Sequence, residues 1–267
     1  MPEIIEVEVV ARSLARHVLH RKIRRLDIFD PKLAGMAAAP LAGRTIRKVF
    51  RAGKEIVFDL SRRDDPLWLC VHLRMTGRLL YRPPKSNPTD RHLRARLTLD
   101  RGSILFHDSR RFGVIRLCRT ASEWTPSGVD PLSDDFTLAR LRELAQGSRT
   151  AVKPWLLRQD KIVGFGNIYA SEVLFAARID PCKSVDKLSD DELKRLHRQT
   201  RRVLKLSLKH GGTTIDDFMD CDGECGGFQR FLQVYGCAGE PCPACGDAIV
   251  RLVQQGRSTF FCPQCQT

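Results

Sequence analysis

The pattern of apolar and polar positions predicts one opening helix followed by short strands. Between Glu3 and His20, apolar residues return every three or four positions, the period of an amphipathic helix. Seven short apolar runs, separated by polar or Gly/Pro signals, then predict strands. They cover residues 23–29, 45–51, 55–60, 67–73, 94–99, 103–107 and 113–118. Strands at this spacing are typical of a β-sandwich or barrel.

The second half of the chain changes to a helical pattern. Pro126 to Pro131, with a glycine between them, predicts a hinge. Helical periodicity follows over residues 138–146, 152–158, 167–177 and 190–210. Gly211 and Gly212 end the last helix, and residues 213–227, rich in Gly and Asp, predict a mobile loop. We therefore expect a helical second domain that ends in a long loop.

Two Cys-x2-Cys pairs near the C-terminus predict a metal site. They are Cys242 with Cys245 and Cys262 with Cys265. The sixteen residues between the pairs match the spacing of a tetrahedral four-thiolate zinc centre. Alternation over residues 251–260, broken at Gln255-Gly256, predicts a hairpin that exposes Arg257. Such a short segment needs the metal to fold. Scattered buried thiols are the alternative, which the regular spacing disfavours.

Charge and composition narrow the class of protein. The 267 residues include 45 Lys and Arg against 31 Asp and Glu, a net charge of +14 that favours a polyanionic partner, either nucleic acid or an anionic membrane surface. The apolar runs are too short to span a membrane, and the acidic start does not resemble a secretory signal. We expect a soluble cytoplasmic protein with no membrane partner, in which ten cysteines serve as metal ligands and reduced thiols.

Several short motifs occur along nearly the whole chain. In order they are Pro2-Glu3, Gly53-Lys54, His72-Leu-Arg-Met-Thr-Gly77, Arg110-Arg-Phe-Gly113, Gly164-Phe-Gly-Asn-Ile-Tyr169 and the cysteine hairpin. Together they resemble the formamidopyrimidine-DNA glycosylase family. The resemblance implies an α+β multidomain protein: an N-terminal β-sandwich with a leading helix, a helix-two-turn-helix domain and a C-terminal zinc-finger hairpin with four cysteine ligands.

The same resemblance implies domain bounds and an activity. We expect a catalytic domain over 1–124, a DNA-binding domain with a lesion-capping loop over 132–227, and a zinc finger over 231–267. The implied enzyme is a monomer with one structural Zn²⁺ that acts on damaged double-stranded DNA in base-excision repair. It is expected to be a bifunctional glycosylase and abasic-site lyase for oxidised purines such as 8-oxoguanine.

The resemblance also assigns catalytic roles. Removal of Met1 would expose the secondary amine of Pro2, which can attack a sugar C1′ and form an iminium. Glu3 would then move protons, and Glu6, one helical turn onward, would support the same site, although both acids also suit a helix dipole. Lys54 is implied to contact a phosphate or the oxidised base, where a solvent-exposed lysine is the alternative.

DNA contacts complete the implied site. Met75, Arg111 and Phe112 match the positions that fill the gap left by a flipped nucleotide, although pattern alone would place Met75 and Phe112 in the core. Asn167 is expected to cap a helix whose free N–H groups bind a phosphate. Further backbone contacts are expected from Lys153, His92 and Arg257, and Arg257 also belongs to the implied catalytic set.

Some positions depart from the family pattern. Ile5 stands where a second proline is usual, Arg74 replaces a glycine, and Leu93-Arg94 replaces an Asp-His pair. None of these changes removes a catalytic group. Three additional cysteines are either free thiols or part of a second metal or redox site: Cys221, Cys225 and Cys237.

Two rival functions remain open. An enzyme of the endonuclease VIII branch would use the same nucleophile on oxidised pyrimidines. Segments 72–77, 110–113 and 212–218 favour the purine branch, because they resemble its wedge loops and its base-capping loop. The second rival is a damage-binding module or zinc-ribbon adaptor without catalysis, which would not need Pro2 and Lys54.

Overall fold

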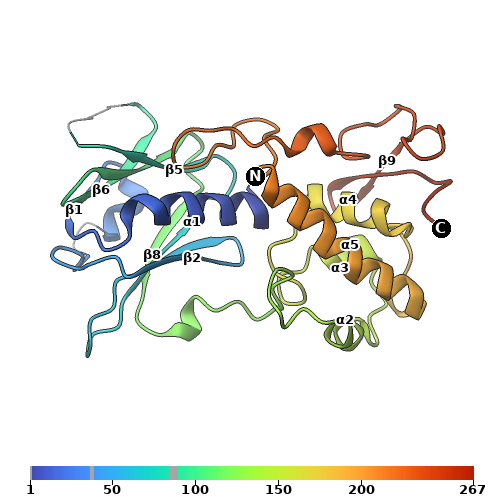
Figure 1. Ribbon diagram of the computed structural model, residues 1–267, viewed down its shortest axis with the longest axis horizontal. Coiled ribbons are helices and arrows are strands. Elements are labelled where there is room, and N and C mark those ends of the chain that lie inside the picture. The colour runs from blue at the N-terminus through green and yellow to red at the C-terminus, as the bar shows by residue number, and fades with distance from the viewer. Residues whose placement is uncertain (1, 37–38, 85–89) are drawn as a thin grey trace. The chain divides into compact units, whose positions relative to one another are not determined.

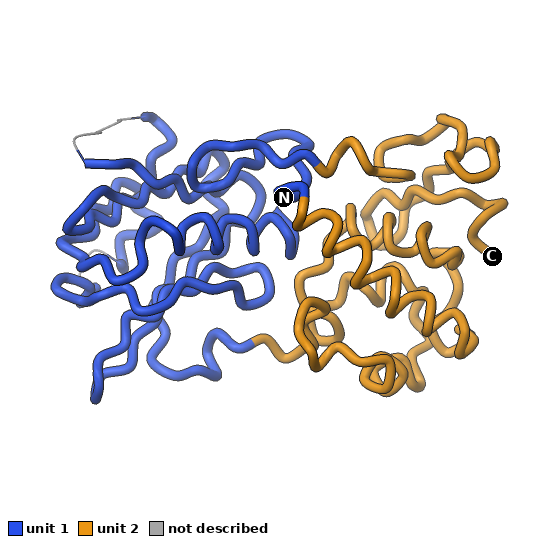
Figure 2. Tube along the Cα trace, in the orientation of Figure 1, with its two compact units in different colours: residues 1–125, 210–227 blue, residues 126–209, 228–267 orange. Residues whose placement is uncertain are grey.

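The computed structural model describes residues 2–36, 39–84 and 90–267, which divide into two compact units (Figures 1 and 2). Unit 1 runs to Thr125 and includes residues 210–227, and unit 2 contains the remainder. Met1, whose removal the catalytic prediction requires, lies outside the described residues. Within those ranges, no helix has both the length and the apolar character needed to cross a membrane.

Unit 1 opens with helix α1 (Ile4–Val18), as the apolar period predicts. Its apolar stripe is buried, including Val7, Val10 and Leu14, and the helix packs on strands β2 (Lys48–Ala52) and β3 (Glu55–Asp59).

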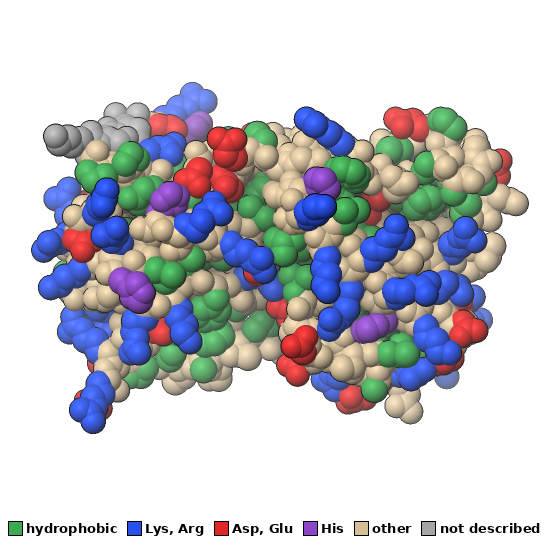
Figure 3. Space-filling model, in the orientation of Figure 1, with side chains coloured by type: hydrophobic (Ala, Val, Ile, Leu, Met, Phe, Trp, Pro, Cys, Tyr) green, Lys and Arg blue, Asp and Glu red, His purple; other side chains and the backbone are tan. Residues whose placement is uncertain are grey.

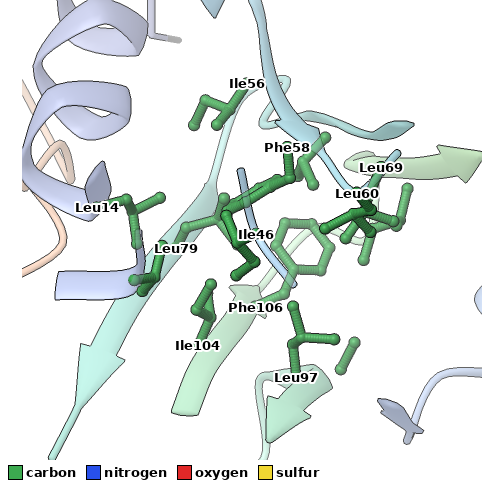
Figure 4. Packing of buried hydrophobic residues seen from close by; sticks show 14 of the residues in the cluster. Leu14, Ile46, Ile56, Phe58, Leu60, Leu69, Leu79, Leu97, Ile104 and Phe106 are labelled. Atoms are coloured by element: carbon green, nitrogen blue, oxygen red, sulfur yellow. The ribbon is translucent and has the colours of Figure 1, made fainter. Parts of the chain in front are cut away.

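The strands of unit 1 form two four-stranded antiparallel sheets. The first has the order β1 (Ile23–Ile28), β6 (Leu93–Leu99), β7 (Ser103–Asp108), β5 (Gly77–Arg82), and the second has the order β2, β3, β4 (Trp68–His72), β8 (Val114–Cys118). Inward-facing side chains of both sheets share one core, with Phe58 and Leu69 from the second and Leu97 and Phe106 from the first (Figure 4). The predicted β-sandwich is confirmed.

Strand β5 is not predicted by the apolar pattern. It begins only five positions after β4 ends at His72, so the apolar pattern does not separate the two strands. Leu79 and Leu80 are also both buried, which breaks the simple alternation of a strand with one solvent-exposed face.

Unit 2 contains the four predicted helices and a C-terminal hairpin. They are α2 (Leu138–Ala145), α3 (Val152–Leu156), α4 (Asn167–Ala177), α5 (Asp190–Lys209), β9 (Val250–Gln254) and β10 (Arg257–Phe261). Short 3₁₀ turns lie at Pro31–Met36 and Ala121–Glu123 in unit 1, and at Val185–Lys187 and Phe228–Phe231 in unit 2. Helix α4 is buried on almost every side because α5 and β10 both pack on it.

The contacts of residues 210–227 differ from the predicted domain division, which placed them with the helical domain. Cys221 is fully buried in the core of unit 1. Its carbonyl accepts a hydrogen bond of 2.8 Å from the Tyr81 N–H, and its own N–H donates to Ser13 Oγ at 3.2 Å. These contacts attach the segment to α1 and β5 of unit 1, while the predicted domain bounds stay a prediction.

The chain that leads to the cysteine hairpin is hydrogen-bonded to helix α4. The buried Glu172 carboxylate on α4 accepts three backbone N–H groups from the chain that leads to the hairpin, from Gln233, Val234 and Tyr235, at 2.8–3.0 Å. The hairpin therefore belongs to unit 2.

Candidate active site and metal centre

Pro2, Glu3 and Glu6 lie together at the start of α1. Glu3 is the N-cap residue, and the side chains of Glu3 and Glu6 each accept a hydrogen bond from the other's backbone N–H, a capping box. The Glu3 N–H donates to Glu6 Oε2 at 2.9 Å. All three residues are buried, and the positive end of the helix dipole favours ionised carboxylates here. The rigid helix start thus fixes the position of Pro2.

Glu6 also binds the beginning of the 210–227 segment. Its Oε1 accepts the Thr213 N–H at 2.8 Å. Gly212 has a φ of +79° and lies so close that a Cβ there would be 3.0 Å from Glu6 Oε1. A side chain at this position would strain both the backbone and the contact. Glu6 therefore acts as a positioning residue, with one oxygen bound to α1 and the other to the segment.

Lys54 lies in the two-residue turn between β2 and β3. Gly53 precedes it with a φ of +60°, which tight hairpin turns favour. Burial, followed by the charges of Arg74 and Lys54, lowers the pKa of His72 to about 4. The His72 imidazole is therefore neutral near pH 7, and the half-buried Lys54 ammonium lies within electrostatic range of it.

Two exposed loop tips carry the predicted wedge residues. Met75, between β4 and β5, is 42% exposed, and Phe112, between β7 and β8, is 48% exposed. The Arg110 guanidinium lies 4.9 Å from the centre of the Phe112 ring, a cation–π contact. The alternative that Met75 and Phe112 are core residues is wrong. Their exposure is what insertion into a base stack requires.

One buried carboxylate, that of Asp108, joins these two loops. Its Oδ1 accepts hydrogen bonds from Thr76 Oγ1 and, at 3.2 Å, from the Arg110 N–H. Its Oδ2 accepts the Gly113 N–H at 2.7 Å. Asp108 therefore fixes the backbone beside both wedge tips, although its side chain is only 1% exposed.

Arg111 is bound by a second buried acid, Asp30. Arg111 Nε donates to Asp30 Oδ2 at 2.8 Å, and a terminal nitrogen donates to Oδ1 at 2.6 Å. This paired hydrogen bonding lowers the pKa of Asp30 to about 2, against the opposing effect of burial. The guanidinium is thus held in one orientation beside Phe112. To contact an orphaned base, it would have to divide its hydrogen bonds between Asp30 and the base or break those to Asp30.

Replacing Asp30 with asparagine is expected to lower the free energy of unfolding by about 1 kcal/mol at pH 7. We expect a smaller loss of free energy than the full pKa shift of Asp30 corresponds to, because the Arg111 side chain is 41% exposed and water screens the pair. The pKa of Asp30 is depressed in the folded state, so its contribution is present above about pH 4 and is lost as the pH falls towards 2. Urea unfolding of both proteins at pH 7 and pH 3 measures this effect. An equal difference at both pH values would contradict it.

His92 lies in a hollow of unit 1 that is lined by charged residues of both signs. Arg78, Arg82, Asp90 and Asp108 belong to this lining. The His92 N–H donates to Asp90 Oδ1 at 2.7 Å, directly before β6. The predicted phosphate contact of His92 stays a prediction.

The structure gives Lys153 a structural role, while the predicted phosphate contact stays a prediction. Its side chain is 1% exposed, and its ammonium donates to Asn167 Oδ1, to the Ser258 carbonyl and to Thr259 Oγ1, at 2.7, 2.7 and 2.8 Å. Lys153 therefore links the start of α4 to β10, and it also lines the hollow of unit 2 that contains Arg257.

Asn167 is the first residue of α4, whereas Gly166 is the N-cap, so the predicted capping role is corrected. Because Asn167 Oδ1 accepts the Lys153 proton, its amide nitrogen is the end of the side chain oriented as a donor to other groups.

Arg257 is exposed at the start of β10, where the hairpin prediction places it. It lines a hollow of unit 2 together with Lys153, Arg158 and Gln254. Arg158 is bound by Asp160 through two hydrogen bonds, so Arg257 contributes the exposed guanidinium that favours an anionic ligand. Figure 3 shows further Lys and Arg side chains on the visible faces of both units.

The four predicted metal ligands converge at the base of this hairpin. Cys242, Cys245, Cys262 and Cys265 place their sulfur atoms within 4.8 Å of one another. The Cys242–Cys265 and Cys245–Cys262 sulfur pairs are 3.9 and 3.5 Å apart. Tetrahedral Zn–S bonds of about 2.3 Å give sulfur separations of roughly 3.8 Å, so the cluster fits zinc.

Comparison with known proteins agrees with this geometry. Residues 1–115 match the model for the formamidopyrimidine-DNA glycosylase N-terminal domain, residues 127–219 match the H2TH domain of the same enzymes, and residues 239–267 match the zinc finger found in FPG and IleRS. The chain belongs to the formamidopyrimidine-DNA glycosylase family. The predicted family and its three-part architecture are confirmed.

Relatives in this family match the whole chain. The formamidopyrimidine-DNA glycosylase of Carboxydothermus hydrogenoformans is 37% identical over the full length of both proteins. The crystal structure of a Lactococcus lactis FPG mutant in complex with Fapy-dG-containing DNA superposes with a TM-score of 0.90 at 32% identity, covering 99% of each chain. Wild-type Lactococcus lactis FPG in complex with DNA containing an oxidised pyrimidine gives a TM-score of 0.89 at 32% identity, again over 99% of each chain.

The departures from the family pattern have structural consequences. Arg74, in place of the family's glycine, has a φ of +55°, a conformation that costs a residue with a side chain about 1 kcal/mol or more. Arg94, in place of a histidine, donates through Nε to the Asp108 carbonyl at 2.7 Å and lies 3.7 Å from Asp30. Ile5 is fully buried in the packed face of α1. Arg94 thus contacts the backbone of Asp108 and the carboxylate of Asp30, the two residues that bind the wedge loops.

Sequence reasoning missed three residues that lie beside the predicted site residues. Asp108 has a visible signal, since it ends a strand directly before the Arg110–Gly113 motif. Asp30 has no such signal in the sequence, because its partner Arg111 is 81 positions away. Arg158 follows a short helix in a polar stretch, where a charged residue is ordinarily a solvated one.

Proposed function

We propose that this chain removes oxidised purines from double-stranded DNA and then cleaves the strand at the resulting abasic site. The observation that carries the proposal is the buried helix start that holds Pro2 beside Glu3 and Glu6. Family membership, a relative bound to Fapy-dG-containing DNA and the net charge of +14 support it.

The proposed reaction begins at Pro2. With Met1 removed, its secondary amine attacks C1′ of the damaged nucleotide, the base departs and an iminium forms. Elimination from the iminium then breaks the strand on both sides of the sugar. The Glu3 carboxylate is placed to transfer protons during these steps, while Glu6 holds the Glu3 peptide in place.

Binding residues are proposed to flip and hold the damaged nucleotide. Met75 and Phe112 would fill the gap in the stack, and Arg111 would hydrogen-bond the orphaned base. Lys54 would contact the lesion or its phosphate. The predicted contacts of His92 and Arg257 with phosphates would give log K a slope of roughly −0.9 per phosphate against log salt.

The ion in the cysteine cluster is proposed to be Zn²⁺, because four thiolates in a tetrahedral arrangement favour it. With all four positions taken by sulfur, the ion would hold the hairpin and leave the chemistry to Pro2. We further propose that the enzyme acts as a monomer.

Oxidised pyrimidines are a second candidate class of substrate. One observation favours it: a structural relative at 32% identity holds DNA with an oxidised pyrimidine. A damage-binding module without catalysis is less well supported, because it has no need of a buried proline and carboxylate at the same helix start.

Borohydride treatment of the processed enzyme with duplex DNA containing 8-oxoguanine tests the proposal. The expected result is a covalent protein–DNA adduct, since reduction fixes the iminium, together with strand cleavage in its absence. A parallel series with 5-hydroxyuracil and thymine glycol is expected to react more slowly. Undamaged duplex of the same sequence is the control.

Two outcomes of that experiment would count against the proposal. No adduct with any lesion would leave a binding protein without catalysis. Faster excision of the pyrimidine lesions than of 8-oxoguanine would move the enzyme to the pyrimidine branch.

A further inference from the structure

A second cluster of metal-ligating side chains lies in unit 1, separate from the four hairpin cysteines. His17 comes from the last turn of α1, and Cys221 and Asp222 come from the 210–227 segment. One imidazole nitrogen, one thiol sulfur and one carboxylate oxygen lie within 4.8 Å of one another. None of the three is needed by the proposed glycosylase chemistry.

The His17 ring is held in place for ligation. It stacks on Tyr81 with ring centroids 4.5 Å apart and an angle of 8° between the planes. Its Nε2 lies 2.7 Å from Asp222 Oδ1, in the range of an ion pair, and no hydrogen bond is assigned to this buried nitrogen among the described residues. An imidazole nitrogen that already faces a carboxylate can bind a metal ion together with that carboxylate.

Cys221 and Asp222 are equally well positioned. Cys221 is fully buried, and its backbone is bonded on both sides, to Ser13 of α1 and to Tyr81 of β5. Asp222 directs one carboxylate oxygen at His17, while its other oxygen lies 3.5 Å from an Arg16 nitrogen. The thiol is therefore fixed by the fold, and the carboxylate is oriented by a neighbouring cation.

The donor set indicates the metal. One sulfur, one nitrogen and one oxygen ligand suit Zn²⁺, and the thiolate disfavours Mg²⁺ and Ca²⁺. Zinc bonds of about 2.0–2.3 Å separate ligand atoms by roughly 3.3–3.8 Å, so the side chains need to move by about 1 Å. An ordinary ion pair accounts for His17 and Asp222 and core packing accounts for Cys221, but neither requires the three donor atoms to lie within 4.8 Å of one another.

We propose that His17, Cys221 and Asp222 form a second zinc site that clamps the 210–227 segment to α1. Water would complete the fourth coordination position, as in other sites with three protein ligands. The other end of the segment is already bonded to α1 through Thr213 and Glu6. The metal would give the segment a second fixed point on the helix that carries Pro2. The site does not depend on the proposed glycosylase activity.

Zinc content per chain tests this site without any assay of activity. Full-length protein is equilibrated with excess Zn²⁺, desalted and analysed by mass spectrometry of the metal. Two zinc ions per chain are expected for the unchanged protein, one for Asp222→Asn and one for His17→Gln. These variants are preferred because Cys221 is in the core, whereas the Asp222 side chain is 37% exposed.

Matched controls separate a built site from surface binding. Asp216→Asn removes the same charge from an exposed position of the same segment, and Cys225→Ser removes an exposed thiol; both variants should keep two zinc ions. As a second measurement, the thiolate-to-metal absorption of Co²⁺-loaded protein should fall by about one fifth in Asp222→Asn, since one of five thiolates loses its metal. One zinc per chain in the unchanged protein, or two in both ligand variants, would overturn the proposal.

Discussion

Replacing Pro2 with glycine is expected to reduce the borohydride-trapped adduct on 8-oxoguanine DNA by about 100-fold or more. The change removes the secondary amine that the proposed mechanism uses as nucleophile and leaves a primary amine in a more flexible backbone. Because Glu3 and Glu6 maintain the capping box at the helix start, the variant should still fold and bind lesion DNA. Adduct yield in a denaturing gel and affinity by fluorescence anisotropy measure the two effects separately.

The control for this experiment is a proline that lies far from the chemistry in sequence. Pro83→Gly makes the same substitution at an exposed position after β5, where no terminal amine is present, and should leave the yield of trapped adduct unchanged. If Pro2→Gly gave as much adduct as the unchanged enzyme, another amine would be the nucleophile.

Loss of the hairpin metal has the second large expected effect. Structural zinc contributes apparent folding free energies of about 10–16 kcal/mol in zinc-finger peptides, so Cys245→Ser should unfold the hairpin. With the position of Arg257 lost, affinity for lesion DNA should fall by at least about 10-fold, the effect of one or two charge-assisted hydrogen bonds. Circular dichroism should still show the β-rich signal of unit 1, because its two sheets are separate from the hairpin.

Cys225→Ser is the matched control for this variant. It exchanges the same atoms at an exposed cysteine outside the four-sulfur cluster, and it should retain both zinc and DNA affinity. Undiminished affinity in a Cys245→Ser protein shown to lack the hairpin zinc would mean that the hairpin does not hold the DNA.

The elements and the metal centre were predictable from the sequence because their signals are local. The period of α1, the alternation of β6 and the two Cys-x2-Cys pairs are each contained in a short stretch. Motifs that resemble a family then predicted the remaining site residues. Predictions based on these signals needed little correction at the level of the fold.

Sequence reasoning reaches less far where tertiary contacts decide the outcome. Lys153 is predicted to contact DNA, but its partners Ser258 and Thr259 are more than 100 positions away, and only the folded chain shows these hydrogen bonds. The 210–227 segment is Gly- and Asp-rich like a solvent-exposed loop, yet Cys221 within it is fully buried. Neither contact has a periodic or compositional signature.

The buried ammonium of Lys153 makes the metal-held hairpin and helix α4 interdependent. Two of its hydrogen bonds end on β10 and another ends on Asn167, at the start of α4. If the hairpin unfolds, this cation loses two acceptors, and a buried charge with fewer acceptors costs free energy. Loss of the hairpin metal is therefore expected to destabilise the start of α4 as well as the hairpin itself.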